Sequence, residues 1–217
     1  MSTFFIATNV PSNQCSSLYC ISLSNSVGSF AREGGPGLVP ILLDGHGNSA
    51  MAFNRVITWA HRDAVEGIFL IGPNMGWDPG VLQTMIASDK DVLAAPVYYN
   101  HRYLLEFDEL SRTERDKKSG EIKVQTASLD FLFLRKSAID ALCEGHPTVQ
   151  FNGEEVKMVL QSGDIFSSYH TDGEILAFRL REAGFHIWVD PSLRVRTSSQ
   201  VLSESNLKEA LEKELQR

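Results

Sequence analysis

The chain has 217 residues, of which 43% are hydrophobic and 22% are charged, as in globular proteins that bury one core. Its formal net charge of -7 argues against a protein that binds polyanions over a large surface, since phosphate contacts need clustered lysines and arginines. The three cysteines, Cys15, Cys20 and Cys143, have neither the number nor the spacing of a disulfide framework or a zinc site.

The first hundred residues alternate short apolar runs with amphipathic segments. Strands are predicted at 4–7, 38–43, 68–71 and 92–98, and helices at 14–32, 50–61 and 81–87. The first helix is expected to bury Leu18, Ile21, Val27 and Phe30. A β-α-β rhythm of this kind predicts a mostly parallel sheet with helices on its faces.

One turn in this half is placed where open α/β sheets bind ligands. The apolar run that ends at Ile71 stops abruptly at Gly72-Pro73-Asn74, a loop with Gly76, Asp78 and Pro79 follows, and a helical pattern begins at Val81. Ligand sites of such sheets lie beyond the carboxyl ends of the strands, so we expect this turn to border a site. An ordinary βα turn is the alternative.

The rhythm changes after residue 100. Residues 102–107 and 121–125 are predicted to form a hairpin around 108–120, a charged stretch interpreted as a solvated loop with a binding site as the alternative. A long mobile segment near a site is expected at 152–170. The remaining elements are strands at 129–134 and 186–189 and helices at 137–143, 172–183 and 206–216.

Three blocks of this sequence resemble those of one family. They are NSAMAFNR at 48–55, FLIGPNMGWDP at 69–79 and DGEILAFRLREAGFHIWVDP at 172–191. They are similar to an S-x-x-x-x-R-N segment, to a strand that ends in D-x-D before a hydrophobic residue, Gly and Trp, and to an acidic helix start followed by W-V-D-P. The family is the small GT-A-type glycosyltransferases of bacteria, phages and large viruses.

The resemblance implies an α/β fold: a GT-A-like (Rossmann-like) mixed, mostly parallel sheet flanked by helices, in a single domain that spans 1–217. Within it, 1–100 would be the nucleotide-sugar-binding half, 101–200 the acceptor half and 201–217 a C-terminal helix. The implied activity is transfer of a sugar from a nucleotide-sugar donor, expected to be a UDP-sugar. The residues that the resemblance assigns to the donor are Ala7, Thr8, Asn9, Asn54, Arg55, Gly72, Asn74 and Trp77.

Gly72 and Asn74 stand where the family has the two aspartates of D-x-D, and this departure concerns the metal. Those aspartates hold a divalent cation, Mn²⁺ or Mg²⁺, against the donor diphosphate. Glycine offers no side-chain oxygen and asparagine a neutral one, so we predict no metal ligand. Three consequences stay open: catalysis without metal through Arg55, Asn74 and helix amides, replacement by Asp78 or Asp44, or loss of catalysis.

Carboxylates are the candidate catalytic groups, because an inverting transfer needs a general base for the acceptor hydroxyl. Asp172 and Glu174 open a predicted helix, where complementing the helix dipole is their alternative role. Asp130 interrupts an apolar strand, and there it either contacts the acceptor or pairs with Arg135 or Arg102.

The acceptor is expected to be a glycan, a protein or a hydroxymethylated DNA base. Arg102, Arg112, Lys117 and Lys118 would supply a local basic surface for DNA, against the acidic balance of the whole chain. His101, Arg102 and His170 are candidates for the acceptor cleft. The competing hypothesis is an inactive GT-A-like module that binds a nucleotide or a protein partner.

The sequence also predicts where the protein works. No apolar run approaches the roughly 20 residues that cross a bilayer, and residues 1–6 lack the basic start of a signal peptide. We therefore expect a cytoplasmic protein, in the host cytoplasm if it is viral, without a membrane partner.

Overall fold

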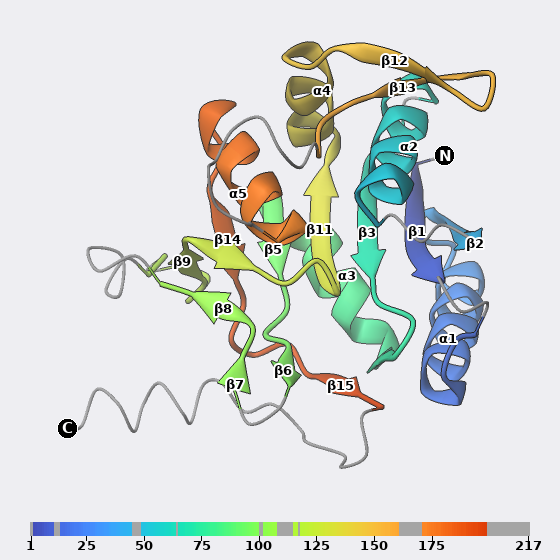
Figure 1. Ribbon diagram of the computed structural model, residues 1–217. Coiled ribbons are helices and arrows are strands. Elements are labelled where there is room, and N and C mark those ends of the chain that lie inside the picture. Colours follow the sequence, from blue (N-terminus) through green and yellow to red (C-terminus); the bar gives the residue numbers. More distant parts are fainter. Residues whose placement is uncertain are drawn as a thin grey trace.

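A seven-stranded mixed sheet runs through the protein (Figure 1). The computed structural model describes residues 2–10, 14–44, 49–63, 65–99, 102–107, 115–116, 118–160 and 171–198. The strands, in their order across the sheet, are β2 (Gly37–Asp44), β1 (Thr3–Val10), β3 (Gly67–Ile71), β11 (Phe131–Arg135), β5 (Val92–Ala94), β14 (Ile187–Val189) and β9 (Ile122–Val124).

Five of these strands share one direction, and β11 and β9 oppose it. β11 is antiparallel to both of its neighbours, β3 and β5, and Figure 1 shows its arrow pointing against theirs. The predicted α/β class, with a mixed sheet in a single domain, is confirmed. The insertion of β11 brings the start of one strand to the edge at which the others end.

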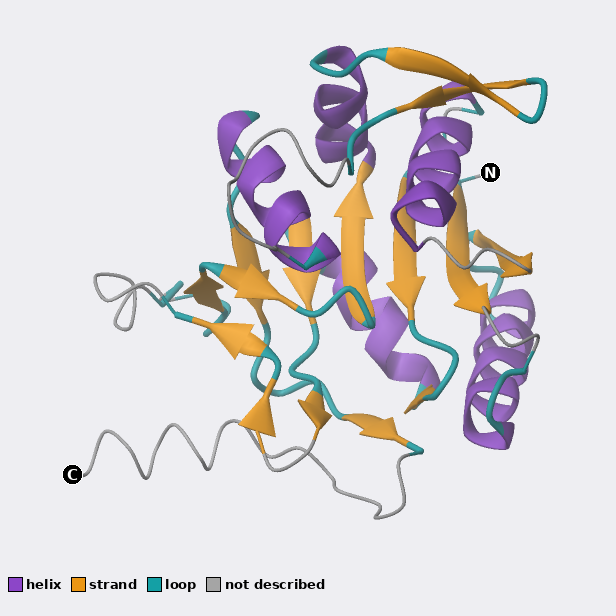
Figure 2. Cartoon of the chain, in the orientation of Figure 1, coloured by secondary structure: helices purple, strands orange, loops and turns teal. Residues whose placement is uncertain are grey.

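Helices cover both faces of the sheet (Figures 1 and 2). α2 (Ser49–Arg62), α4 (Lys136–Glu144) and α5 (Asp172–Glu182) pack on one face, and α1 (Ser17–Arg32) and α3 (Pro79–Ala87) pack on the other. Side chains of β3 alternate between the two layers: Ile68 and Leu70 face α2 and α4, whereas Phe69 and Ile71 face α1 and α3. This two-sided burial explains why β3 is uniformly apolar in sequence.

The turn after β3 is fixed from two sides. The Gly72 amide donates to the backbone oxygen of Asp130 at 2.9 Å, and the backbone oxygen of Asn74 accepts from the Ser198 amide at 2.9 Å. β4 (Met75–Trp77) continues from the turn and pairs with β15 (Val195–Thr197). The turn therefore belongs to the ordered framework of the sheet edge.

The second half departs from the predicted hairpin. β8 (Leu105–Glu106) pairs with β10 (Thr126–Ala127), whereas β9 (122–124) joins the main sheet beside β14. Burial favours this pairing, because Ile122 and Val124 are buried where β9 lies against β14. A second short ladder joins β6 (Tyr98–Tyr99) to β7 (Arg102–Tyr103).

A hairpin also forms where a mobile segment was expected. β12 (Thr148–Phe151) and β13 (Glu154–Lys157) pair through a turn in which Asn152 and Gly153 have positive φ. Residues 161–170 and the predicted helix at 206–216 lie outside the described residues. None of the helices in the described ranges combines the length and apolarity that crossing a membrane requires.

Candidate functional site

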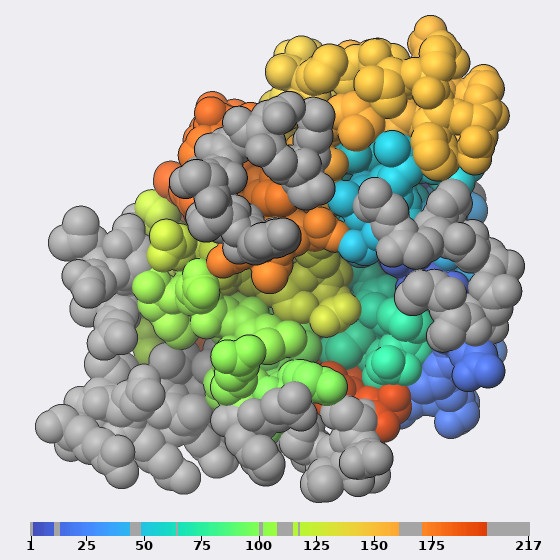
Figure 3. Space-filling view, in the orientation of Figure 1, coloured from blue at the N-terminus to red at the C-terminus, as the bar shows by residue number. Residues whose placement is uncertain are grey.

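A cavity of about 570 Å³ opens at the edge of the sheet where the parallel strands end. Asn9 of β1 and Gly72 after β3 reach it from the sheet, and Asp130 reaches it from the start of β11. Ser49 and Asp172 line it from the first residues of α2 and α5. Figure 3 shows the face on which these segments meet, with α2 in cyan and α5 in orange. The volume is that of a small-molecule site, typically about 300–1,000 Å³.

The carboxylate of Asp130 stands where a side chain at position 72 would otherwise be. A Cβ atom added to Gly72 would lie 2.6 Å from Asp130 Oδ1, well inside contact distance. Asp130 Oδ2 accepts a hydrogen bond from the Ser128 hydroxyl at 2.9 Å, which fixes the carboxylate. The position of Asp130 therefore requires a glycine at position 72. The carboxylate in this part of the wall is that of Asp130, at the start of β11.

The two acids at the start of α5 have different surroundings. Asp172 Oδ2 accepts a hydrogen bond from the Ser49 hydroxyl, which joins α5 to α2 across the cavity wall. Glu174 instead accepts from the Thr171 amide, and Thr171 Oγ1 accepts from the Glu174 amide, so the pair forms a capping box. Both acids line the cavity, but the Glu174 carboxylate is engaged in stabilising the helix.

Asn9 is a lining residue with an unmatched polar atom. Its buried Oδ1 has no hydrogen-bond partner among the described residues. A buried acceptor without a donor costs roughly 1–3 kcal/mol. A donor from a ligand or from water would therefore stabilise the wall at this point.

The charges of the cavity are mainly negative. Its described lining residues include four acids, Glu106, Asp130, Asp172 and Glu174, and one guanidinium, Arg102. The helix dipole places a partial positive charge at the amino end of α2, and no acid in the first turn of this helix neutralises it. A strongly anionic group would meet repulsion over most of this wall.

Three of the predicted donor-binding residues lie in the core. Ala7 and Thr8 are fully buried, and Thr8 Oγ1 hydrogen-bonds to the Tyr19 hydroxyl at 2.6 Å. Burial raises the pKa of Tyr19 to about 12, so this hydroxyl stays neutral. Trp77 is 3% exposed and donates through Nε1 to Ser26 Oγ at 2.9 Å. The structure brings none of the three to the cavity wall.

Asn54 and Arg55 fasten α2 to the segment that follows β12. Asn54 is fully buried, donates to the Leu160 oxygen at 2.9 Å and accepts from the Leu160 amide at 2.7 Å. The Arg55 guanidinium pairs with Glu154 Oε2 at 3.0 Å and lies over the ring of Trp59. Both residues have structural partners away from the cavity, and the side chain of Asn74 is exposed outside its lining.

Sequence reasoning missed several residues of the wall. Ser49 and Phe53 belong to the NSAMAFNR block at 48–55, but the sequence does not single them out as site residues. The others depend on the pairing of β8 with β10, which no sequence signal announces. The missed lining residues include Ser49, Phe53, Tyr103, Glu106, Thr126 and Ser128.

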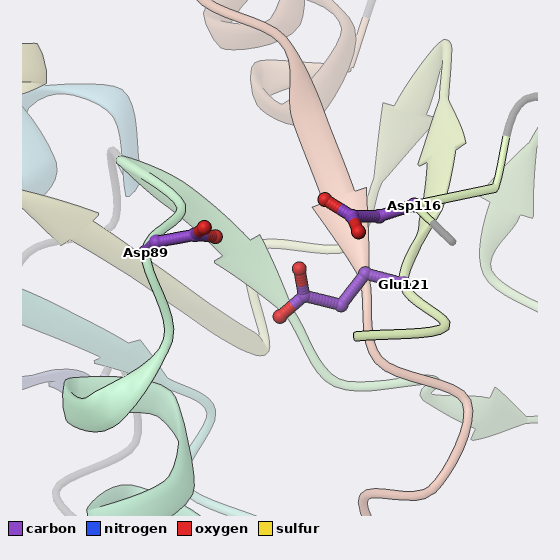
Figure 4. Close-up of side chains that lie close together, drawn as sticks. All are labelled: Asp89, Asp116 and Glu121. Atoms are coloured by element: carbon purple, nitrogen blue, oxygen red, sulfur yellow. The ribbon is translucent and has the colours of Figure 1, made fainter. Parts of the chain in front are cut away.

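A separate acidic cluster already contains a cation. Carboxylate oxygens of Asp89, Asp116 and Glu121 lie within 4.8 Å of one another (Figure 4). The Lys90 ammonium lies 2.9 Å from Asp89, 2.5 Å from Asp116 and 3.7 Å from Glu121, and it holds the pKa of Asp116 well below its usual range. An ammonium in this position makes the cluster an ion-pair network.

The cavity does not fit a dedicated metal cage. Within the described ranges, no group of three potential ligands other than the Lys90 cluster lies close enough to hold an ion. Gly72 offers no side-chain oxygen, and a Cβ there would collide with Asp130. A divalent ion in the cavity would take most of its ligands from a bound diphosphate and from water.

Comparisons with known proteins address the fold. Neither a protein-family model nor a curated protein sequence matches the chain. The catalytic domain of Drosophila beta1,4-galactosyltransferase 7, solved in complex with xylobiose, aligns with a TM-score of 0.52 over 98% of this chain and 80% of that one, at 10% identity. The chain has a GT-A-like fold.

A second solved structure agrees with this architecture. A197 from STIV aligns with a TM-score of 0.53 over 95% of both chains, at 11% identity. At such identities the likeness concerns the fold, so the chemistry has to be argued from the side chains of the cavity.

Proposed function

We propose that the protein is a glycosyltransferase that moves a sugar from a nucleotide-sugar donor, expected to be a UDP-sugar, to an acceptor hydroxyl. The observation that carries the proposal is the cavity at the carboxyl edge of a GT-A-like sheet, with Asp130 and Asp172 in its wall. Ligands of open α/β sheets bind at this edge.

Asp172 is our candidate for the general base. Its carboxylate lines the cavity and is held by Ser49, whereas the Glu174 carboxylate is used by the capping box. In an inverting transfer, Asp172 would take the proton of the acceptor hydroxyl while that oxygen bonds to the anomeric carbon. The bond from this carbon to the diphosphate oxygen breaks, and the nucleoside diphosphate leaves with the electron pair.

Two positive features of the wall support a place for the departing diphosphate. The amino end of α2 carries the positive end of the helix dipole and has no acid in its first turn, and Arg102 lines the cavity. Arg55 is engaged with Glu154, so its use would require that ion pair to open. Independence from a divalent metal remains a prediction.

The proposal is tested by titrating a panel of nucleotide sugars into the protein in a calorimeter, with Mn²⁺ and with EDTA, and by assaying released nucleoside diphosphate. We expect one donor to bind with a Kd below about 1 mM and to be hydrolysed slowly. Asp172→Asn should lower hydrolysis by about 100-fold or more while donor affinity is kept. Asp63→Asn, at an exposed acid directly after the carboxyl end of α2, is the matched control.

A competing function is a GT-A-like module that binds a nucleotide or a protein without turnover. The loss of both D-x-D aspartates, at Gly72 and Asn74, motivates it. Tight binding of a donor without any hydrolysis would favour this module. Failure of the whole panel to bind would contradict the transferase.

A further inference from the structure

Three acids of the cavity share one arrangement, in which each is held by a neighbouring hydroxyl. Asp130 Oδ2 accepts from Ser128, Asp172 Oδ2 accepts from Ser49, and Glu106 Oε2 accepts from Thr126 at 3.2 Å. All six side chains line the cavity. Their elements are β8, β10, the start of β11, α2 and α5, so the arrangement is not the product of one local turn.

This arrangement leaves acceptor atoms for a ligand. No described hydrogen bond uses the second carboxylate oxygen of Asp130 or Asp172. An ionised carboxylate only accepts hydrogen bonds, so a ligand that satisfies these oxygens must bring several O–H or N–H donors. A serine or threonine of a protein acceptor brings one hydroxyl and would leave most of the oxygens unmatched.

Away from Arg102 and the amino end of α2, the charge of the wall selects against anions. Four carboxylates face one guanidinium among the described lining residues. Like charges repel more strongly in a partly desolvated cavity than in bulk water, because the effective dielectric constant there is lower. A DNA duplex, which presents a phosphate on every nucleotide, would also have to extrude a base to enter a cavity of this size.

Apolar surface completes the site. Phe53 of α2 and Tyr103 of β7 line the cavity together with Leu105 and Leu129. A saccharide ring combines an apolar face of C–H groups with a rim of hydroxyls. Aromatic side chains cover such a face at low entropic cost, while the fixed carboxylates accept from the hydroxyls.

We infer that the acceptor in the proposed transfer is a neutral saccharide, bound by the Asp130, Asp172 and Glu106 carboxylates and covered by Tyr103 and Phe53. The role of this saccharide as the acceptor rests on the proposed function. The ligand class rests on the charge, hydrogen-bonding capacity and volume of the cavity.

The test measures binding without a nucleotide. An array of neutral di- and trisaccharide methyl glycosides is compared, by saturation-transfer NMR and calorimetry, with sulfated counterparts, a serine-containing peptide and a duplex with 5-hydroxymethylcytosine. We expect at least one neutral saccharide to bind with a Kd of about 1 mM and its sulfated form at least about tenfold more weakly. The peptide and the duplex should not bind.

Variants separate recognition from folding. Asp130→Asn should weaken the neutral saccharide and also narrow its advantage over the sulfated form, an effect that general loosening of the fold would not produce. Tyr103→Ala should weaken binding about tenfold, whereas Tyr99→Ala, an exposed tyrosine of the adjacent strand β6, should leave it unchanged. Thermal denaturation of each variant checks that the fold is kept.

The outcomes also distinguish this inference from the proposed function. Tighter binding of the duplex, the peptide or the sulfated sugars, or silence of the whole neutral array, would overturn the inference even if a nucleotide sugar were hydrolysed. Binding of a neutral saccharide, with no nucleotide sugar bound or hydrolysed, would support the neutral saccharide as ligand and would contradict the proposed glycosyltransferase function.

Discussion

The close approach of Gly72 to Asp130 sets the shape of the cavity wall. We predict that Gly72→Ala destabilises the protein by about 1–3 kcal/mol, because the new Cβ would lie 2.6 Å from Asp130 Oδ1. The carboxylate would have to turn away from the Ser128 hydroxyl. Thermal unfolding measures the loss, and Asp130→Ala in the same chain should recover part of it.

Gly80→Ala is the matched control for this prediction. A Cβ at Gly80 would meet only Gln83 Oε1, at 4.0 Å, and the residue lies in α3. Replacing a helical glycine with alanine usually stabilises by roughly 0.5–1 kcal/mol. Equal effects of the two substitutions would show that Asp130 does not restrict position 72.

Asn54 illustrates a residue whose location assigns it a structural role. Asn54→Ala should lower stability by about 2–4 kcal/mol, since it leaves both the amide and the oxygen of Leu160 unpaired in the interior. Chemical denaturation measures the loss. Asn74→Ala, with an exposed side chain, should be nearly neutral. A fully stable Asn54→Ala protein that fails to bind donor would restore the earlier assignment of Asn54 to the nucleotide.

At the scale of elements, α1 shows where hydrophobic periodicity misleads. The apolar stripe predicted Ile21 as buried, yet Ile21 is 59% exposed and the buried face carries Ser22, Ser26 and Ser29. The serines are buried because Trp77 donates to two of them, through its backbone amide to Ser22 and through Nε1 to Ser26. Hydrophobic periodicity treats these serine positions as exposed and therefore predicts the wrong buried face for α1.

This packing gives a testable prediction for α1. Ser26→Ala should cost roughly 1–2 kcal/mol, because the indole N–H of Trp77 would be buried without an acceptor. Ser24→Ala, on the exposed side of the same helix, should leave stability unchanged. Urea titration followed by tryptophan fluorescence reports both. A neutral Ser26→Ala would mean that water replaces the hydroxyl.

The same reasoning explains which parts of the fold the sequence predicts. β1, β3 and the helices between them were found because local apolar runs and turn residues mark them. The direction of β11 and the pairing of β8 with β10 depend on contacts between distant segments, and hydrophobic patterns carry no information on strand partners. Residues at the ends of strands or helices, such as Asn9, Gly72 and Asp172, were therefore predicted as site residues. Glu106, Thr126 and Ser128 were not.

At the scale of the whole molecule, two acidic clusters of the described residues differ in their partners: the Lys90 network contains a cation, and the cavity is open. Lys90 neutralises the acids of the loops before β5 and β9 and also lies over the Trp188 ring at 4.8 Å. The cavity carboxylates, in contrast, have mostly hydroxyl partners. The network stabilises the fold, and the cavity keeps its acceptor atoms for a ligand.

The network makes stability depend on pH in a direction that can be derived. The Lys90 ammonium holds the pKa of Asp116 below the ordinary aspartate value of 3.8, so the folded state takes up this proton at a lower pH than the unfolded state does. The contribution of Asp116 is present above pH 3.8 and is lost as the pH falls through the lower folded pKa. The raised pKa of Lys90 gives a contribution that is present below 10.5 and is lost only at higher pH.

Lys90→Met should therefore destabilise the protein most strongly between about pH 5 and 9. At pH 7 we expect a loss of about 2 kcal/mol, because the buried Glu121 carboxylate loses its cation, and the melting temperature should fall by roughly 4–8 °C. Lys118→Met, at an exposed position of the loop before β9, is the control. Differential scanning calorimetry from pH 3 to pH 9 should show the deficit of Lys90→Met shrinking as the pH falls below about 4, because the stabilisation from the lowered pKa of Asp116 declines once the pH is below the ordinary aspartate value. A deficit of constant size over the whole range would mean that Lys90 acts through its packing on Trp188 and not through its charge.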